Sequence, residues 1–147
     1  MNPLLEFALG DDGLDVTDVP VKSFRVEHTT LQNIREFIEY WHYSNNVAGL
    51  RSDYCFQLMH EGQMIGAMIY GRVAMPGAWK KYVEKEDELI ELRRLCGIDK
   101  TPKNTESFFI GHTIKWLRKN TNIKTIVSYA DTFRGHEGTI YKASNFK

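Results

Sequence analysis

Two strand-like segments separated by one short turn constrain the fold of this chain more than any other feature. Residues 54–59 and 64–70 are rich in aromatic and aliphatic side chains, as buried strands are. Between them lies His60-Glu61-Gly62-Gln63, which supplies a glycine for a tight turn. We therefore expect a β-hairpin, and with it an antiparallel pair of strands at the heart of a sheet.

The rest of the chain alternates between strand and helix patterns. Apolar positions recur at helical spacing over residues 30–40 and 105–119. Further strands are predicted at residues 24–28, 88–95 and 123–129, with a short helix carrying Tyr141 after the last of them. The order β-α-β-β-β-α-β-α predicts an α/β (α+β) domain, a mixed sheet with flanking helices. This order is similar to that of the GNAT acetyltransferase fold.

A length of 147 residues fits one domain that can bury a core without disulfides. Residues 1–21 contain Asp11-Asp12-Gly13 and Pro20 with weak periodicity, so we expect an irregular acidic lead-in before a single domain over residues 22–147. The predicted elements end just after Tyr141. We therefore expect either that a closing C-terminal strand of the sheet is missing or that the lead-in compensates for it.

Composition excludes several classes of protein. No apolar run approaches the ~20 residues of a membrane span, and residues 1–9 lack the basic flank of a secretory signal. Cys55 and Cys96 lie far apart in apolar, strand-like surroundings, without the spacing of metal ligands. This pattern indicates buried free thiols in a cytoplasmic protein.

The formal net charge of zero hides an asymmetry along the chain. Residues 1–61 carry four basic and ten acidic side chains, whereas residues 62–147 carry fifteen basic and nine acidic ones. A solvated surface position is the simpler interpretation of any single lysine, but the collective excess indicates an anionic partner, a phosphate-bearing cofactor or nucleic acid. Within this half, Trp79 and Tyr82 interleave with Lys80 and Lys81, as in loops that stack on bases.

A phosphate seat is predicted where a strand ending in Arg93-Arg94 leads to the helix that opens at residues 104–107. The first turn of a helix offers backbone N–H groups and a positive dipole end. Arg94 would add a charge-assisted contact and Ser107 a hydroxyl group. The alternative is an ordinary capped helix, with the arginines paired to Glu88 or Glu91. Further polar candidates beside this seat are Asn104, expected to bind the same cofactor, and Tyr70.

Chemistry-bearing side chains gather after the strand predicted at residues 123–129. Asp131 follows the carboxyl end of that strand, where open α/β sheets place their ligands. His42 and Tyr43 end the first helix, where a packed, hydrogen-bonded histidine is the commoner role. With Asp131 and Tyr141 they offer one imidazole and three oxygen donors, a set that suits Fe(III) better than zinc. His136, flanked by glycines, is either a general base or phosphate contact, or a loop residue without a role.

Together these motifs resemble the Mom family of phage DNA-modification proteins over roughly residues 24–146. The resemblance rests on His42-Tyr43, Tyr70-Gly71, Arg93-Arg94-Leu95, Pro102-Lys103-Asn104-Thr105-Glu106-Ser107, Ser128-Tyr129-Ala130-Asp131 and Gly135-His136-Glu137-Gly138-Thr139-Ile140-Tyr141-Lys142-Ala143-Ser144-Asn145-Phe146. It implies a GNAT-like fold that binds acetyl-coenzyme A and acts on adenine in duplex DNA. The implied product is an N6-substituted adenine, carbamoylmethyl in the founding member, which protects phage DNA from host restriction.

The resemblance also assigns residues. It places Arg94 and Ser107 in the coenzyme A site. The catalytic residues, which are also the iron ligands proposed for the family, are His42, Tyr43, Asp131 and Tyr141 by this resemblance. Two rivals remain, an ordinary GNAT N-acetyltransferase acting on a protein or small amine, and a non-enzymatic DNA-binding or anti-restriction module. A homodimer is a further assembly left open.

Overall fold

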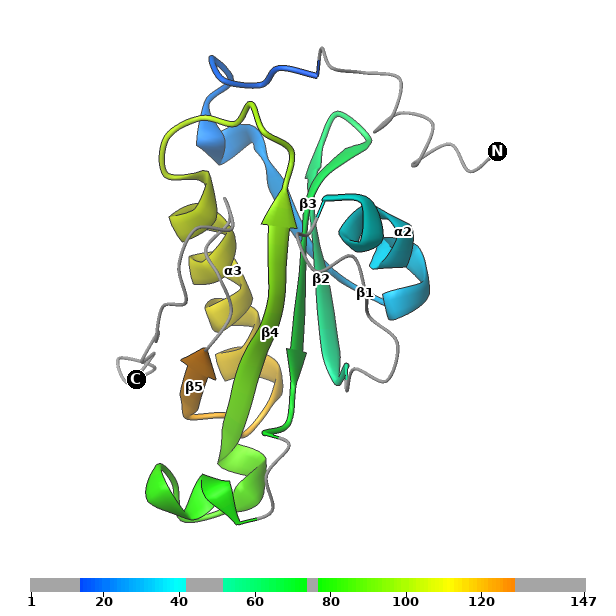
Figure 1. The fold of residues 1–147 in the computed structure, drawn as a ribbon. Helices are drawn as coiled ribbons and strands as arrows, with labels where there is room; N and C mark the ends of the chain where they lie inside the picture. The colour runs from blue at the N-terminus through cyan, green and yellow to red at the C-terminus, as the bar shows by residue number, and fades with distance from the viewer. Residues whose placement is uncertain (1–13, 42–51, 74–76, 129–147) are drawn as a thin grey trace.

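A computed structural model describes residues 14–41, 52–73 and 77–128 of the protein. In it, five strands form one mixed sheet in the order β1-β2-β3-β4-β5 (Figure 1). The strands are β1 (Arg25–Thr29), β2 (Tyr54–His60), β3 (Gln63–Gly71), β4 (Leu89–Gly97) and β5 (Thr125–Ser128). The first four are antiparallel neighbours, and β5 pairs parallel to β4. The predicted mixed sheet is therefore confirmed.

The hairpin expected from the sequence lies inside this sheet. β2 and β3 pair from Tyr54 opposite Tyr70 to His60 opposite Gln63. Glu61 and Gly62 form the turn, with φ angles of 49° and 80°. Positive φ at both central residues matches the right-handed twist of the strands, and glycine adopts it without steric cost.

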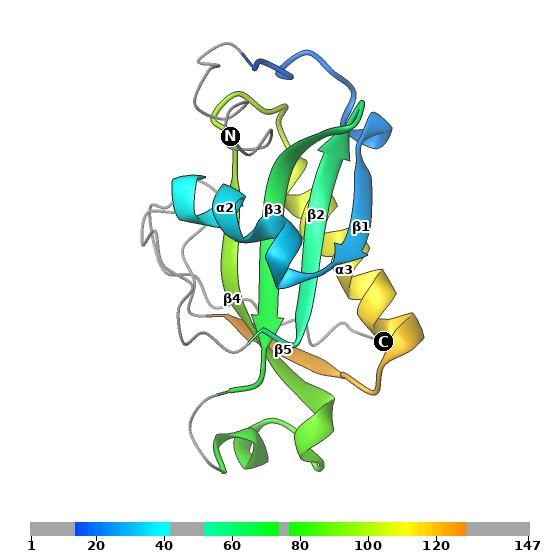
Figure 2. The same ribbon diagram turned by 90° about the vertical axis from the view of Figure 1, so that its right-hand side faces the viewer.

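Two helices cover opposite faces of the sheet, α2 (Leu31–Trp41) on one and α3 (Thr105–Asn120) on the other (Figure 2). α2 buries Ile34, Phe37 and Ile38, and α3 buries Phe109, Thr113 and Leu117 at a spacing of four residues. Each stripe follows the helical period, which is why the sequence pattern located both helices. Three short 3-10 helices, η1 (Val21–Ser23), η2 (Ala78–Lys81) and η3 (Glu86–Glu88), occur in the connections.

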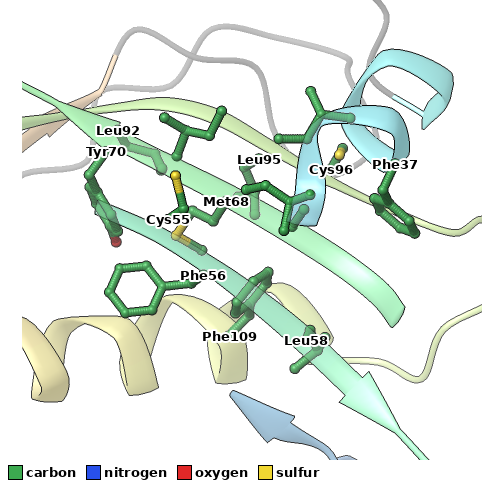
Figure 3. Close-up of a cluster of buried hydrophobic side chains, with 14 of the residues drawn as sticks. Phe37, Cys55, Phe56, Leu58, Met68, Tyr70, Leu92, Leu95, Cys96 and Phe109 are labelled. Atoms are coloured by element: carbon green, nitrogen blue, oxygen red, sulfur yellow. The ribbon is translucent and has the colours of Figure 1, made fainter. Parts of the chain in front are cut away.

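The core is continuous across both faces of the sheet (Figure 3). β3 is buried from Met64 to Gly71 because helices cover it from both sides. Cys55 and Cys96 are free, buried thiols, as expected from the sequence. Burial raises the pKa of Cys55 to about 11, so this thiol stays protonated at neutral pH.

Part of the expected lead-in attaches to the loop after β4. Val16 is buried, and its N–H donates to the carbonyl of Lys100 over 3.0 Å. Asp15 forms an isolated parallel bridge with the same residue. The helix predicted around Tyr141 and the question of a closing strand lie outside the described residues. No helix in the described ranges is long and apolar enough to span a membrane.

Candidate functional site

In the part of the chain that the structure describes, the sheet opens between β4 and β5. β5 pairs only with Leu89 to Leu92, the first four residues of β4. β4 continues for five residues to Gly97, and in the described part of the chain no strand pairs with this stretch from the β5 side. Such a strand edge presents N–H and C=O groups that an extended ligand can bind.

A β-bulge marks the point where the opening begins. Ile69 of β3 lies opposite Arg94, but the next residue, Tyr70, lies opposite Leu92, so Arg93 is an extra residue in β4. A bulge bends its strand, and bulges are over-represented beside active sites. The arginine pair thus lies inside β4, two residues further from its end than the sequence pattern indicated.

The register also shows which way the charged side chains of β4 point. The Tyr70 hydroxyl group is hydrogen-bonded to Thr113 of α3 over 2.7 Å, so the Tyr70 side chain lies on the α3 face. Successive residues of a strand alternate between faces, so the neighbouring positions 69 and 71 belong to the opposite face, which α2 covers. Residues directly opposite one another in a ladder share a face. Arg94, opposite Ile69, and Glu91, opposite Gly71, therefore lie on the α2 face.

These charges are half-buried and interact with one another. Arg93 Nη2 lies 3.7 Å from Glu91 Oε1 and donates to the carbonyl of Arg72 over 2.6 Å, and Arg94 Nη1 donates to the carbonyl of Arg93 over 2.8 Å. Burial raises the pKa of Glu91, while the charges of Arg93 and Arg94 oppose that shift. Glu91 was expected only as a pairing partner of the arginines, although charged residues inside an otherwise apolar strand are a signal of this cluster.

The N-terminus of α3 lies just beyond the end of β4 (Figure 1). Asn104 precedes the helix with φ 72° and ψ 10°, and its side chain makes no capping hydrogen bond. Thr105 Oγ1 instead donates to the carbonyl of Pro102 over 2.7 Å. Ser107 is exposed in the first turn. The helix dipole gives this end a partial positive charge, which favours an anion.

Arg94 and Ser107, expected to hold one cofactor, come from different layers of the fold. Arg94 points to the face covered by α2, whereas Ser107 belongs to the helix on the other face. The part of β4 beyond Leu92 and the loop from β4 to α3 lie between these two residues in the chain. A common role for them stays a prediction.

Tyr70, a polar candidate from the sequence, is not exposed to a ligand. Its side chain is fully buried, and its hydroxyl group is hydrogen-bonded to Thr113. Burial raises the pKa of this hydroxyl well above its usual range. Tyr70 therefore ties the sheet to α3. Both faces of β3 are covered, so the sequence of this strand has no alternation that would show which face Tyr70 meets.

The other predicted site residues lie outside the described ranges. They are His42, Tyr43, Asp131, His136 and Tyr141. Within those ranges, no group of three histidine, cysteine, aspartate or glutamate side chains is placed to hold a metal ion. The iron site stays a prediction from resemblance.

Comparisons with known proteins found similar sequences over most of the chain. Residues 23–147 match the Mom protein family. The methylcarbamoylase Mom of Escherichia phage Mu is 29% identical over 129 residues, which are 85% of this chain and 53% of that protein. The chain thus spans about half the length of this relative.

Solved structures show the fold. A GNAT family acetyltransferase from Brucella melitensis, in complex with acetyl-CoA, has a TM-score of 0.54 at 16% identity, covering 74% of this chain and 76% of that one. The loading GNATL domain of CurA from Lyngbya majuscula has a TM-score of 0.50 at 13% identity, covering 74% of this chain and 65% of that one. The GNAT-like fold expected from the order of elements is confirmed.

Proposed function

This chain belongs to the Mom protein family, and from that premise we propose that it is a transferase that modifies adenine in duplex DNA, using acetyl-coenzyme A. The proposed product is an adenine with a carbamoylmethyl-like group at N6, which protects phage DNA from host restriction. The family match over residues 23–147 and the similarity to a phage methylcarbamoylase support this substrate.

The observation that carries the proposal is the opening between β4 and β5, which leads from the bulge at Arg93 to the N-terminus of α3. The residues present fit coenzyme A in two respects. The amides of its pantetheine arm match the edge of β4 beyond Leu92, where no described strand pairs from the β5 side. Its pyrophosphate matches the positive end of α3. A similar fold has been solved with acetyl-CoA bound.

In this arrangement three residues hold the cofactor. Arg94 supplies a guanidinium group from the α2 face, and Ser107 supplies a hydroxyl group from the first turn of α3. Asn104 shapes the turn that presents the N–H groups of the helix, because its left-handed backbone redirects the chain into α3. Bound acetyl-coenzyme A would supply an activated two-carbon acyl group with the coenzyme A thiol as leaving group; a carbamoylmethyl product needs in addition a nitrogen donor and a two-electron oxidation of the methyl carbon.

The DNA side of the reaction imposes two requirements. Adenine N6 is a poor nucleophile because its lone pair is delocalised into the ring, so it needs a group that orients it and takes up a proton. The base must also leave the stack, at a cost of about a few kcal/mol. We assign the orientation of the base to Asp131, His42, Tyr43 and Tyr141, the set that the family resemblance indicates. The alternative role for these four side chains, by the same resemblance, is to hold iron.

Mass spectrometry of nucleosides tests the proposal directly. DNA from cells that make the protein should contain a modified deoxyadenosine, and the D131A variant, folded by its melting profile, should give none. Unmodified deoxyadenosine from cells with abundant soluble protein would contradict the proposal. Full activity of D131A would contradict the site assignment alone.

Thermal-shift titrations separate the two rivals. An ordinary GNAT N-acetyltransferase would be stabilised by acetyl-coenzyme A but not by duplex DNA. A non-enzymatic DNA-binding module would be stabilised only by DNA, in a salt-dependent manner. The proposed enzyme responds to both ligands.

A further inference from the structure

The connection between β3 and β4 includes a turn over residues 77–82, at one end of the sheet (Figure 1). Backbone hydrogen bonds close this turn, from Lys80 N–H to the Gly77 carbonyl over 3.2 Å and from Tyr82 N–H to the Trp79 carbonyl over 2.9 Å. Gly77 starts the turn with φ 76°, a conformation that favours glycine. Backbone hydrogen bonds within the turn therefore fix the positions of the Cα atoms from which its side chains extend.

Three neighbouring side chains of this turn face solvent: Lys80, Lys81 and Tyr82, which we call the η2 surface. Tyr82 is 39% exposed, and only Tyr40 is a comparably exposed large hydrophobic residue in the described part of the chain. Lys80 Nζ lies 5.8 Å from the centroid of the Trp79 ring, so the ring makes a cation–π interaction with the lysine. Two cations beside an exposed ring suit a partner that combines phosphates with flat, apolar groups.

Two of the four acidic residues of the connection, Asp87 and Glu88, are engaged away from η2, whereas Glu84 and Glu86 are exposed. Glu88 Oε2 lies 3.0 Å from Lys124 Nζ, and Asn122 Nδ2 donates to Asp87 over 3.1 Å. The Lys124 N–H also donates to the Glu88 carbonyl over 2.8 Å. These contacts fix η3 to the turn between α3 and β5, so the two carboxylates do not neutralise the η2 surface.

A hollow beside η3 carries more cations than carboxylates. It has a volume of about 470 Å³ and lies between η3 and the turn after α3. The charged residues of its lining are Lys85, Arg118 and Lys124, with Asp87 and Glu88. Cations thus border the connection on the side of α3 as well, which suits a partner with a repeated negative charge.

We propose that the η2 surface binds the phosphate backbone of the duplex DNA substrate, with Lys80 and Lys81 at phosphates and Tyr82 against the adjoining sugars and base edges. This inference rests on the proposed function. Glu88 ends η3, and Arg93 at the opening lies five residues further along β4, a distance of about 17 Å at ~3.3 Å per residue. One turn of duplex is about 34 Å long. One turn of duplex is therefore longer than the stretch of chain between η3 and the opening at Arg93.

The test measures binding of the full chain to a fluorescent duplex by anisotropy over a range of salt concentrations. Each lost phosphate contact lowers the slope of log K against log salt by about 0.9. The K80A/K81A double variant should therefore bind more weakly, with a slope smaller by about 1.8, equally for any duplex sequence. K80R/K81R should keep the slope of the wild type. Y82A should weaken binding but leave the slope of log K against log salt unchanged.

The matched control is K22A/K115A, which removes the same charge from exposed lysines of η1 and α3 outside this surface. A thermal shift with acetyl-coenzyme A shows that each variant is folded. Equal losses in K80A/K81A and the control would overturn the inference, because the effect would then be one of net charge. If the wild type modifies adenine and K80A/K81A binds DNA with an unchanged slope, the inference is overturned but the proposed function is not. If the wild type binds no duplex DNA, both the inference and the proposed function fail.

Discussion

The Tyr70 hydroxyl of β3 lies 2.7 Å from the Thr113 hydroxyl of α3, and both side chains are fully buried. The Thr113 hydroxyl also donates to the carbonyl of Ile110 within α3, over 2.8 Å. This contact is a polar link between the sheet and a helix inside an otherwise apolar core. It explains why a tyrosine occupies a position that is closed to solvent.

The first prediction concerns this link. Y70F keeps the ring in contact with Phe56 but removes the hydrogen bond, so it should lower the free energy of unfolding by about 1 to 2 kcal/mol. Denaturant titration followed by circular dichroism measures the change. Y82F, which alters an exposed ring, should have no effect on stability. Equal stability of Y70F and the wild type would show that the buried hydroxyl contributes nothing.

Alanine substitutions at two glycines, Gly66 and Gly111, should change stability in opposite directions. A Cβ at Gly66 would lie 3.2 Å from Leu58 Cβ and 3.3 Å from both the Cys96 carbonyl oxygen and the Phe109 ring, whereas a Cβ at Gly111 meets nothing within 4 Å. G66A should destabilise the protein by about 1 to 3 kcal/mol through overpacking. G111A should stabilise α3 by about 0.5 to 1 kcal/mol, because alanine has the higher helix propensity. Thermal melts of both variants check the signs, and a stable G66A would contradict the packing of α3 against β3.

The Glu88–Lys124 pair predicts a dependence of stability on pH. The hydrogen bond from Lys124 holds the pKa of Glu88 below its ordinary value of 4.5. Because this carboxyl has a lower pKa in the folded than in the unfolded protein, its contribution is present above pH 4.5 and is lost as the pH falls through the folded value. E88Q should melt at a lower temperature than the wild type at neutral pH, and the difference should shrink in acid. A constant difference across this range would contradict the linkage.

The cofactor assignment predicts the effect of Arg94 on binding. R94A should weaken acetyl-coenzyme A by roughly tenfold or more, as expected for the loss of a charge-assisted hydrogen bond of about 1.5 to 3 kcal/mol. Isothermal titration calorimetry measures this loss. R25A is the control, since Arg25 lies in the edge strand β1 with its side chain 79% exposed. Wild-type affinity in R94A would remove Arg94 from the cofactor site.

Much of the fold was predictable, because both helices and the hairpin depend on local patterns. The period of four in α3 and the glycine at position 62 fixed those elements without reference to the rest of the chain. The bulge at Arg93 was not predictable, because it exists only in the pairing of β4 with β3. The buried role of Tyr70 was missed for a related reason: β3 is covered on both faces, so its side chains carry no alternation that would show which face each one meets.

The pairing of β4 with β5 has a further consequence for the folded state. In the described part of the chain β5 pairs only with the first four residues of β4, so a cofactor lying along the rest of β4 would add the hydrogen bonds of a further strand to the sheet. Binding free energy would then add to the free energy of folding. In the free protein the amide hydrogens on that edge of β4 would exchange with solvent, and occupancy would protect them. Cofactor binding and the protection of the β4 amides from exchange would thus report the same equilibrium.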